Sequence, residues 1–149
     1  MPEVVCGALV RGGRVLLVHR SPSKRAYPNV WDLPGGIVEA GESELDALTR
    51  ELHEELGVQI VTGSASHLCR GTVGAADDPA RLSAWLVRDW SATPANVAPD
   101  EHDDLGWFAH DELPPPAHAV ARTALLAALE LSGTRRPARD PGAAADRHG

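Results

Sequence analysis

The stretch from Ser43 to Gly57 constrains the fold most strongly, because it predicts one amphipathic helix with clear ends. Ser43 is a typical helix N-cap residue with Asp46 three positions later, a shortened capping box, and Gly57 is a typical C-terminal stop. Leucines recur at three- and four-residue steps, which places them on one helix face: Leu45, Leu48, Leu52 and Leu56. We expect this face to be buried.

A second stripe of the same helix carries the carboxylates of Glu51, Glu54 and Glu55 within about one turn. Like charges at this spacing destabilise a helix by a few tenths of a kcal/mol per pair. A divalent cation would reverse that repulsion, and Mg²⁺ is usually held by one or two carboxylates together with substrate phosphates. The stripe therefore predicts half of a metal site that phosphate completes. The alternative is a solvated acidic face in which Arg50 pairs with Glu54.

The segment before the helix adds glycines and one more carboxylate. Pro34, Gly35 and Gly36 follow a strand-like run, and glycine allows close backbone approaches that other residues prevent. Glu42 stands just ahead of the helix. From Gly36 to Val58 the pattern is G-x5-E-x7-R-E-L-x-E-E-x-G-V.

This pattern resembles the signature of the Nudix hydrolases at every fixed position. The resemblance covers about residues 2–131 and implies an α/β fold, the Nudix α/β/α sandwich with a mixed β-sheet. It also implies a metal-dependent pyrophosphohydrolase that uses Mg²⁺, or Mn²⁺ in its place. The metal ligands that it implies are Glu51, Glu54, Glu55 and the backbone carbonyl of Gly35.

Hydrolysis of a diphosphate needs neutralised phosphoryl oxygens, a positioned water and a group that takes its proton. Bound metal supplies the first two and lowers the pKa of its water. We expect Arg50 to hold the helix carboxylates through ion pairs, with Glu42 assisting from beside it. The residues expected to carry the catalysis are Glu42, Arg50, Glu51, Glu54 and Glu101.

The general base stays open between two positions. Nudix enzymes use either a glutamate of the signature or a glutamate from a later loop. Here Glu101 is the later residue, with Asp103 and Asp104 as rivals. A solvent-exposed loop carboxylate is the alternative interpretation of Glu101.

Three further residues are expected to contact the substrate. Arg20 ends the second strand, where Nudix enzymes often carry a basic phosphate contact, although a surface arginine is the simpler explanation. Gly36 belongs to the turn before the helix, and Trp107 is an aromatic residue that can stack on a base. Trp85 and Trp90 are alternatives for stacking, and packing in the core is the commoner role for each tryptophan.

Markers of individual Nudix subgroups are missing. A proline after the signature would suggest ADP-ribose, yet Gly74 occupies that place, and a tyrosine there would suggest dinucleoside polyphosphates, yet Tyr27 is the only tyrosine. The asparagine that oxidised-guanine hydrolases carry near the last helix is also missing, since Asn29 and Asn96 are the only asparagines. By elimination we expect a nucleoside triphosphate or a related nucleoside diphosphate derivative.

Two other classes of protein remain as alternatives. One is a nucleotide-sensing binding module, which usually has a degraded signature, and the other is an isoprenoid-diphosphate isomerase, which relies on extra cysteine and glutamate residues. The signature here is intact, and Cys6 and Cys69 give the isomerase little support. The histidines at 102, 110 and 118 invite a zinc interpretation, but their spacing resembles no common zinc motif.

Composition sets the outer limits. The 149 residues with 43% hydrophobic content predict one domain, residues 1–132, followed by a disordered Arg/Pro/Ala-rich tail, residues 133–149. No apolar run is long enough to span a membrane, and no secretory signal is recognisable, so we expect a cytoplasmic protein. The net charge of −7 argues against polymeric nucleic acid as a partner. The oligomeric state, monomer or homodimer, is not readable.

Outside the signature, the pattern predicts a β-hairpin over 4–11 and 14–20, with Gly12-Gly13 at its turn. Further strands are expected at 58–61, 67–73 and 81–90, with a loop over 75–79. A last helix is expected over 117–131, packed on the sheet.

Overall fold

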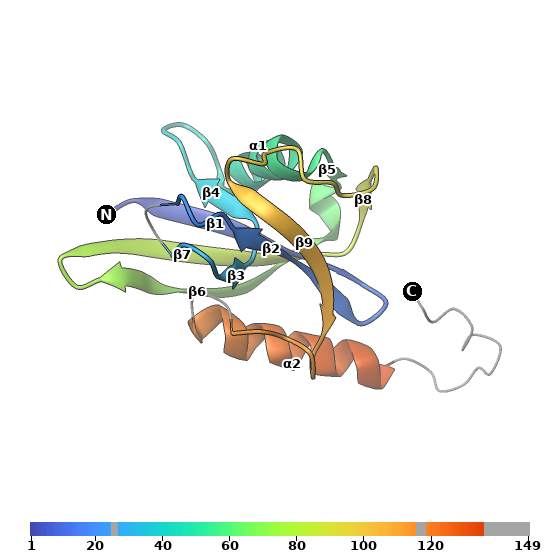
Figure 1. Cartoon of the computed structure of the whole chain (residues 1–149). Helices are drawn as coiled ribbons and strands as arrows, with labels where there is room; N and C mark the ends of the chain where they lie inside the picture. The colour runs from blue at the N-terminus through green and yellow to red at the C-terminus, as the bar shows by residue number, and fades with distance from the viewer. Residues whose placement is uncertain (25–26, 116–118, 136–149) are drawn as a thin grey trace.

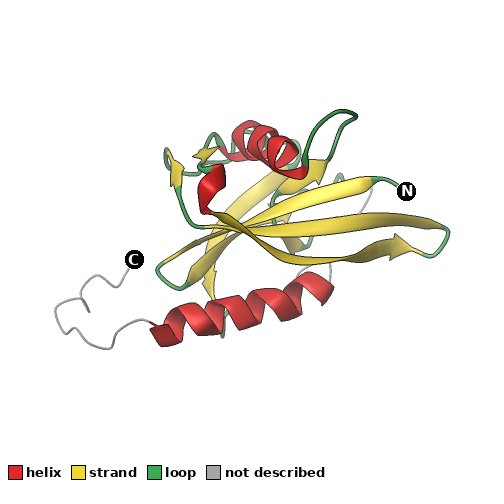
Figure 2. Cartoon of the chain, turned by 180° about the vertical axis from the view of Figure 1, so that it is seen from behind, coloured by secondary structure: helices red, strands yellow, loops and turns green. Residues whose placement is uncertain are grey.

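The computed structural model describes residues 1–24, 27–115 and 119–135, and it shows a mixed β-sheet between two helices (Figure 1). Helix α1 (Glu44–Leu56) covers one face of the sheet and helix α2 (Ala119–Arg135) covers the other (Figure 2). This arrangement is the expected α/β/α sandwich. No described helix is long and apolar enough to cross a membrane.

The sheet has seven strands, and its main path runs β3-β2-β1-β7-β6. Strand β4 also pairs with β1, and β9 pairs with β2. Strands β1 and β7 are parallel, and the other pairs in this sheet are antiparallel. The strands are β1 (Glu3–Arg11), β2 (Arg14–Arg20), β3 (Trp31–Asp32), β4 (Gly35–Ile37), β6 (Ala65–Ala75), β7 (Asp78–Val87) and β9 (His102–Ala109). Strands β5 (Gln59–Ile60) and β8 (Trp90–Ser91) form a separate pair, and a short 3-10 helix covers Thr62–Ser64.

Strand β1 lies between two hydrophobic cores. Successive strand residues point to opposite faces, so Val5 and Leu9 pack in the core beneath α1, while Cys6 and Val10 pack in the core beneath α2. This explains why β1 is an almost unbroken apolar run. Both cysteines of the chain, Cys6 and Cys69, are free thiols.

Helix α1 has the ends that the sequence predicted. The Ser43 side chain accepts a hydrogen bond from the Asp46 N–H and the Asp46 side chain accepts one from the Ser43 N–H, which completes the capping box. Gly57 ends the helix in the left-handed conformation, with φ of 72°. The leucines at 48, 52 and 56 are fully buried, so the apolar face positions the acidic stripe relative to the sheet.

Several boundaries differ from the expectations. The hairpin of β1 and β2 is confirmed, but the loop expected over 75–79 is a tight turn, since β6 ends at Ala75 and β7 begins at Asp78. The strand expected over 81–90 ends at Val87, and Trp90 begins β8. Helix α2 continues to Arg135, past the expected domain end at residue 132. The rest of the tail expected to be disordered, residues 136–149, lies outside the described residues.

Candidate active site

Strand β4 pairs the signature loop with the first half of strand β1. Gly36 lies opposite Val5 in the β1–β4 pairing, and Gly35 lies opposite Cys6. A Cβ atom on Gly36 would lie 2.4 Å from the Glu51 carboxyl group. The Glu51 carboxyl group therefore lies directly on the β4 backbone, and any side chain at residue 36 would displace it.

Arg50 ties the start of the motif to the helix. Its guanidinium donates to both oxygens of Glu42, from Nε to Oε2 and from Nη2 to Oε1, at 2.8 Å in each case. It also donates from Nη1 to Glu51 Oε2 at 2.9 Å and from Nη2 to the Ile37 carbonyl at 3.1 Å. This bidentate hydrogen bonding by Arg50 lowers the pKa of Glu42 to about 2. The Arg50 to Glu54 pair of the solvated-face interpretation exists, but it is longer, at 3.7 Å.

Glu55 is in the opposite situation, because it is buried beside another acid. Only 4% of its surface is exposed. Burial raises the pKa of the Glu55 carboxyl group well above its usual range, and the neighbouring Glu51 and Glu101 carboxyls raise it further. A backbone hydrogen bond from Gly35 opposes these effects. The Oε1 atom of Glu55 has no hydrogen-bond partner among the residues that the structure describes.

Two residues at the start of β9 lie near Glu55: Glu101, just before the strand, and His102, its first residue. Glu101, His102 and Glu55 each offer one ligand atom, and these atoms lie within 4.8 Å of one another. His102 is 3% exposed, and its Nε2 is 3.8 Å from Glu55 Oε1. Burial lowers the pKa of His102 to about 4, so the ring is neutral at neutral pH. Glu101 is more exposed and accepts a hydrogen bond from Lys24 Nζ at 3.1 Å.

The loop before β9 is fastened to the last turn of α1, whose carbonyl groups have no partner inside the helix. The N–H of Val97 donates to the Glu55 carbonyl, and the N–H of Ala95 donates to the Leu56 carbonyl, both at 3.0 Å. Between them, the Asn96 side chain donates to the His102 carbonyl at 2.7 Å. The helix end and the start of β9 are therefore held together by backbone and amide hydrogen bonds.

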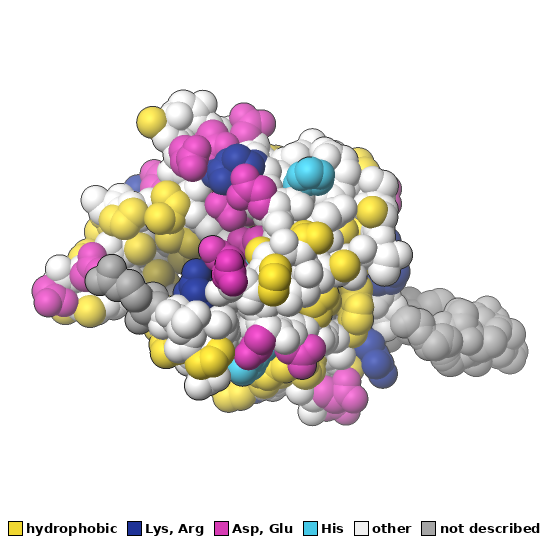
Figure 3. All heavy atoms as spheres, turned by 45° about the horizontal axis from the view of Figure 1, so that its top comes forward, with side chains coloured by type: hydrophobic (Ala, Val, Ile, Leu, Met, Phe, Trp, Pro, Cys, Tyr) yellow, Lys and Arg dark blue, Asp and Glu magenta, His cyan; other side chains and the backbone are white. Residues whose placement is uncertain are grey.

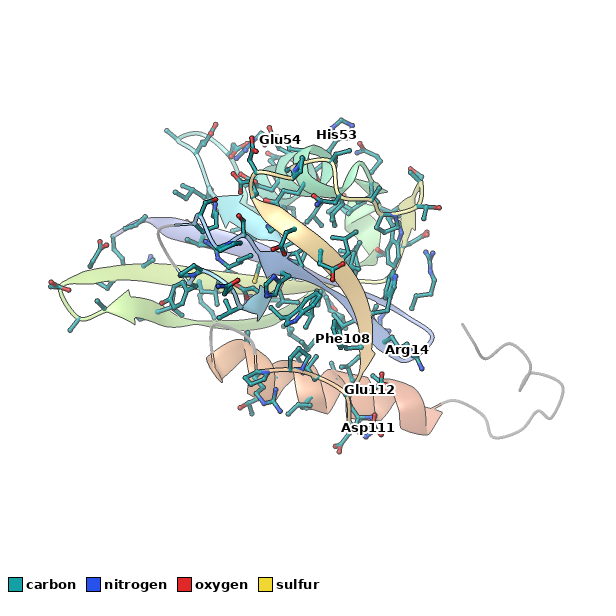
Figure 4. The ribbon with its side chains drawn as sticks, viewed as in Figure 1. Arg14, His53, Glu54, Phe108, Asp111 and Glu112 are labelled. Carbon is teal, nitrogen blue, oxygen red and sulfur yellow. The ribbon has the colours of Figure 1, made fainter. Side chains whose placement is uncertain are left out.

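A cavity of about 910 Å³ opens in front of these groups. Its acidic wall is formed by Glu51, Glu54, Glu55 and Glu101. Arg20 and Lys24 add positive charge to the same cavity, and its apolar lining includes Val4, Cys6, Leu33 and Leu82. Acidic side chains, with lysine or arginine side chains among them, gather on the face shown in Figure 3. Glu54 projects from the outer side of α1, beside the exposed His53 (Figure 4).

The structure brings most of the predicted site residues together at this cavity: Arg20, Gly35, Gly36, Glu51, Glu54, Glu55 and Glu101 all line it. Glu42 and Arg50 are not among the lining residues, but Arg50 donates to Glu51 and is itself held by Glu42. The rivals of Glu101 have other partners, since Asp103 binds the His19 ring at 2.6 Å and Asp104 accepts from the Leu105 N–H.

Trp107 does not lie where a substrate contact was expected. It is not among the described residues that line the cavity, and its ring stacks on Trp90, with ring centroids 6.2 Å apart. The Arg11 guanidinium lies over the Trp90 ring at 3.9 Å. Only the aromatic ring of Trp107 suggested a substrate contact. Trp107 lies opposite Leu16 in the β2–β9 pairing, which places its ring on the α1 face of the sheet.

Two residues near the acidic wall were not predicted: Lys24, which lines the cavity, and His102, which is buried beside Glu55. Lys24 pairs with Glu101, and His102 faces Glu55. The spacing of His102 from His110 and from His118, which lies outside the described residues, gave no indication of this role. The useful signal was instead its position directly after Glu101.

The residues present fit a divalent cation. Three signature carboxylates and Glu101 lie on one wall of the cavity. The guanidinium of Arg50 on α1 is already engaged with Glu42 and Glu51. Glu55 has a buried carboxyl oxygen, Oε1, without a hydrogen-bond partner among the described residues, so the bonding of this carboxyl group is incomplete as it stands. Oxygen ligands of this kind suit Mg²⁺ or Mn²⁺.

A sandwich with carboxylates and basic side chains around one cavity suits an enzyme that acts on phosphate groups with the help of a cation. A family model described as the NUDIX domain matches residues 1–129. A CTP pyrophosphohydrolase of Escherichia coli (strain K12) is 36% identical over 140 residues, which are 93% of this chain and 98% of that protein. The chain therefore belongs to the Nudix hydrolase family, and it is a pyrophosphohydrolase.

Two other comparisons agree with this assignment. The crystal structure of a MutT NUDIX hydrolase from Burkholderia pseudomallei matches with a TM-score of 0.74 at 36% identity, over 83% of this chain and 95% of that chain. The NAD-capped RNA hydrolase of Pseudomonas aeruginosa is 34% identical over 134 residues, which are 87% of this chain but 45% of that protein. Members of this family generally use divalent metal ions.

Proposed function

We propose that this protein uses Mg²⁺, or Mn²⁺ in its place, to hydrolyse the diphosphate linkage of a nucleoside triphosphate or a related nucleoside diphosphate derivative. The products would be a nucleoside monophosphate and pyrophosphate, or the corresponding phosphorylated product. The observation that carries this proposal is the acidic wall of Glu51, Glu54, Glu55 and Glu101 in a cavity that also contains Arg20 and Lys24. Such a wall repels a phosphate chain unless a cation lies between them.

The residues divide the work according to their surroundings. Glu51, Glu54, Glu55 and the Gly35 carbonyl would hold the metal, which neutralises phosphoryl oxygens and lowers the pKa of a bound water. Arg20 would neutralise the part of the phosphate chain that the metal does not reach.

The proton of the attacking water needs an acceptor. Glu54 and Glu101 both line the cavity with an exposed carboxylate, and either can accept that proton. Glu42 and Arg50 would act through Glu51, whose carboxylate Arg50 fixes at 2.9 Å. This arrangement keeps the metal ligands oriented before the substrate binds.

Two features support a free nucleotide as the substrate. The cavity combines a charged end with an apolar lining that includes Val4, Leu33 and Leu82, which suits a base joined to a phosphate chain. The relative that matches over nearly its whole length is named for CTP, while the NAD-capped RNA hydrolase matches over less than half of its length. The net charge of −7 disfavours a long nucleic acid.

Chromatographic separation of the products, nucleoside monophosphate and pyrophosphate, over a nucleotide panel tests the proposal. The panel contains CTP, dCTP, ATP, 8-oxo-dGTP, ADP-ribose, diadenosine tetraphosphate and a capped RNA, each with Mg²⁺ and with EDTA. We expect a nucleoside triphosphate to be hydrolysed with Mg²⁺ and not with EDTA. Binding without turnover of any member would instead indicate a nucleotide sensor, and hydrolysis of the capped RNA alone would overturn the choice of substrate.

A further inference from the structure

His102 takes no part in the chemistry described above, although it is buried against one of the proposed metal ligands. Its Nε2 lies 3.8 Å from Glu55 Oε1, and both side chains are about 95% buried. Oε1 and the other ring nitrogen, Nδ1, have no hydrogen-bond partner among the described residues. We propose that His102 is a positioning residue, whose Nε2–H donates to Glu55 Oε1 and so turns the second oxygen of that carboxylate toward the metal.

The irregular pairing of β9 with β2 explains how the ring reaches this place. Asp104 lies opposite His19, but the next paired residues are His102 and Arg20, so one residue of β9 is extra at this point. A bulge of this kind re-aims a side chain, and such bulges are frequent beside active sites. Here it leaves Asp103 and Asp104 exposed and turns His102 inward.

The backbone around His102 is held firmly enough to direct the ring. Its N–H donates to the Ala98 carbonyl at 3.1 Å, and its carbonyl accepts from the Asn96 side chain at 2.7 Å. The same loop binds the carbonyl of Glu55 itself through the Val97 N–H. The imidazole and the carboxylate are therefore held near one another through their backbones, and the proposed hydrogen bond of about 3 Å requires a side-chain rotation that closes the separation of 3.8 Å.

A hydrogen bond to one oxygen of a metal-binding carboxylate orients that group and increases its affinity for the metal. Direct ligation of the metal by His102 is the competing explanation, since Glu55, Glu101 and His102 could share one ion. The Lys24 ammonium group lies 3.1 Å from Glu101 Oε1, and a cation bound between Glu101 and His102 would have to displace it. The positioning role requires no such displacement.

The role of His102 rests on the proposed metal ligand Glu55, so Mn²⁺ binding without nucleotide is the first measurement. It is made on the full chain by following free Mn²⁺ with electron paramagnetic resonance. His102→Phe keeps a ring without a donor, and His102→Gln keeps an N–H donor of shorter reach. We expect the phenylalanine variant to bind Mn²⁺ about tenfold more weakly than the wild type, with the glutamine variant closer to the wild type.

The control is His53→Gln, which changes an exposed histidine of the same helix and should leave Mn²⁺ binding unaltered. Thermal melting shows whether each variant is folded, and His102→Leu replaces the phenylalanine variant if that chain does not fold. In kinetics with a nucleotide substrate, loss of positioning lowers kcat and leaves KM nearly unchanged.

Three results would overturn the role of His102. They are wild-type Mn²⁺ affinity in the folded phenylalanine or leucine variant, a glutamine variant no better than the variant without a donor, and a spin-echo signal from a nitrogen bound directly to Mn²⁺. A wild-type protein that binds Mn²⁺ but hydrolyses no nucleotide would overturn the proposed function alone. In that case the Mn²⁺ affinities of the variants still decide the role of His102.

Discussion

Two groups of carboxylates on the same short motif have opposite surroundings. Around Arg50, the carboxylates of Glu42 and Glu51 accept hydrogen bonds from one guanidinium at 2.8 to 2.9 Å. Around Glu55, a buried carboxyl lies near two other acids and a neutral imidazole, and one of its oxygens has no partner among the described residues. The first group is satisfied within the protein, whereas the second keeps a buried oxygen without a partner among the described residues, beside the proposed cation site.

The largest effect is expected from Glu54→Gln, which removes a charge from the acidic wall without changing the size of the side chain. Because Arg50 contacts Glu54 only at 3.7 Å, the fold should not depend on this charge. We expect the Mg²⁺-dependent rate to fall about 10³-fold, the range of a lost catalytic carboxylate. Initial rates with the nucleotide that the wild type hydrolyses fastest measure this loss. His53→Gln, at the residue directly before Glu54, is the control (Figure 4). Equal rates in Glu54→Gln and the wild type would remove Glu54 from the site.

Glu55→Gln should lower activity and, without metal, stabilise the protein. The folded-state pKa of Glu55 is raised, so its contribution to stability is complete below the unfolded pKa of about 4.3 and is lost as the pH rises toward the folded pKa. A glutamine does not ionise and escapes this loss. In EDTA at about pH 8 we expect a gain of about 1 to 2 kcal/mol, measured as a rise in Tm of several degrees.

The same two proteins provide the check on this prediction. Added Mg²⁺ should raise the Tm of the wild type more than that of Glu55→Gln, because only the wild type has the full set of carboxylates. A variant that melts below the wild type at every pH would show that the buried charge stabilises the protein without metal.

Arg50→Lys tests the region that is complete without metal, and its effect should be smaller. Lysine cannot bind both oxygens of Glu42 and also reach Glu51. We expect the Tm to fall by a few degrees with a partial loss of activity. The pKa of Glu42 is lowered to about 2, so the stability from this pair is present above about pH 4.5 and is lost as the pH falls toward 2. Melting curves over that interval should show a weaker acid dependence in Arg50→Lys.

The smallest effect is expected from Trp107→Phe, because the structure places this ring outside both regions. Phenylalanine retains part of the stacking on Trp90. We expect the KM for the nucleotide to stay within about twofold of the wild type, with a slightly lower Tm. A large rise in KM at constant kcat would return Trp107 to the binding site.

Local patterns predicted what depends on local geometry. The helix from 44 to 56, its capping box and its leucine face follow from residues within one or two turns of each other, so spacing alone identifies them. The same holds for the cavity lining by Gly36, Glu51 and Glu54, because these residues belong to one continuous motif. The hairpin of β1 and β2 was predictable for the same reason.

The Nudix signature, the helix with its buried face and the stripe of carboxylates for which we propose a cation could be recognised from the residues alone, because these properties belong to near neighbours in the chain. The distant residues that join them became visible in the folded molecule. Glu101 and His102 reach Glu55 because a loop binds the open carbonyls at the end of α1 and a bulge turns the ring inward, while the register of β9 sends Trp107 elsewhere. Such contacts depend on pairing between strands far apart in the chain, which the local spacing of residues does not encode.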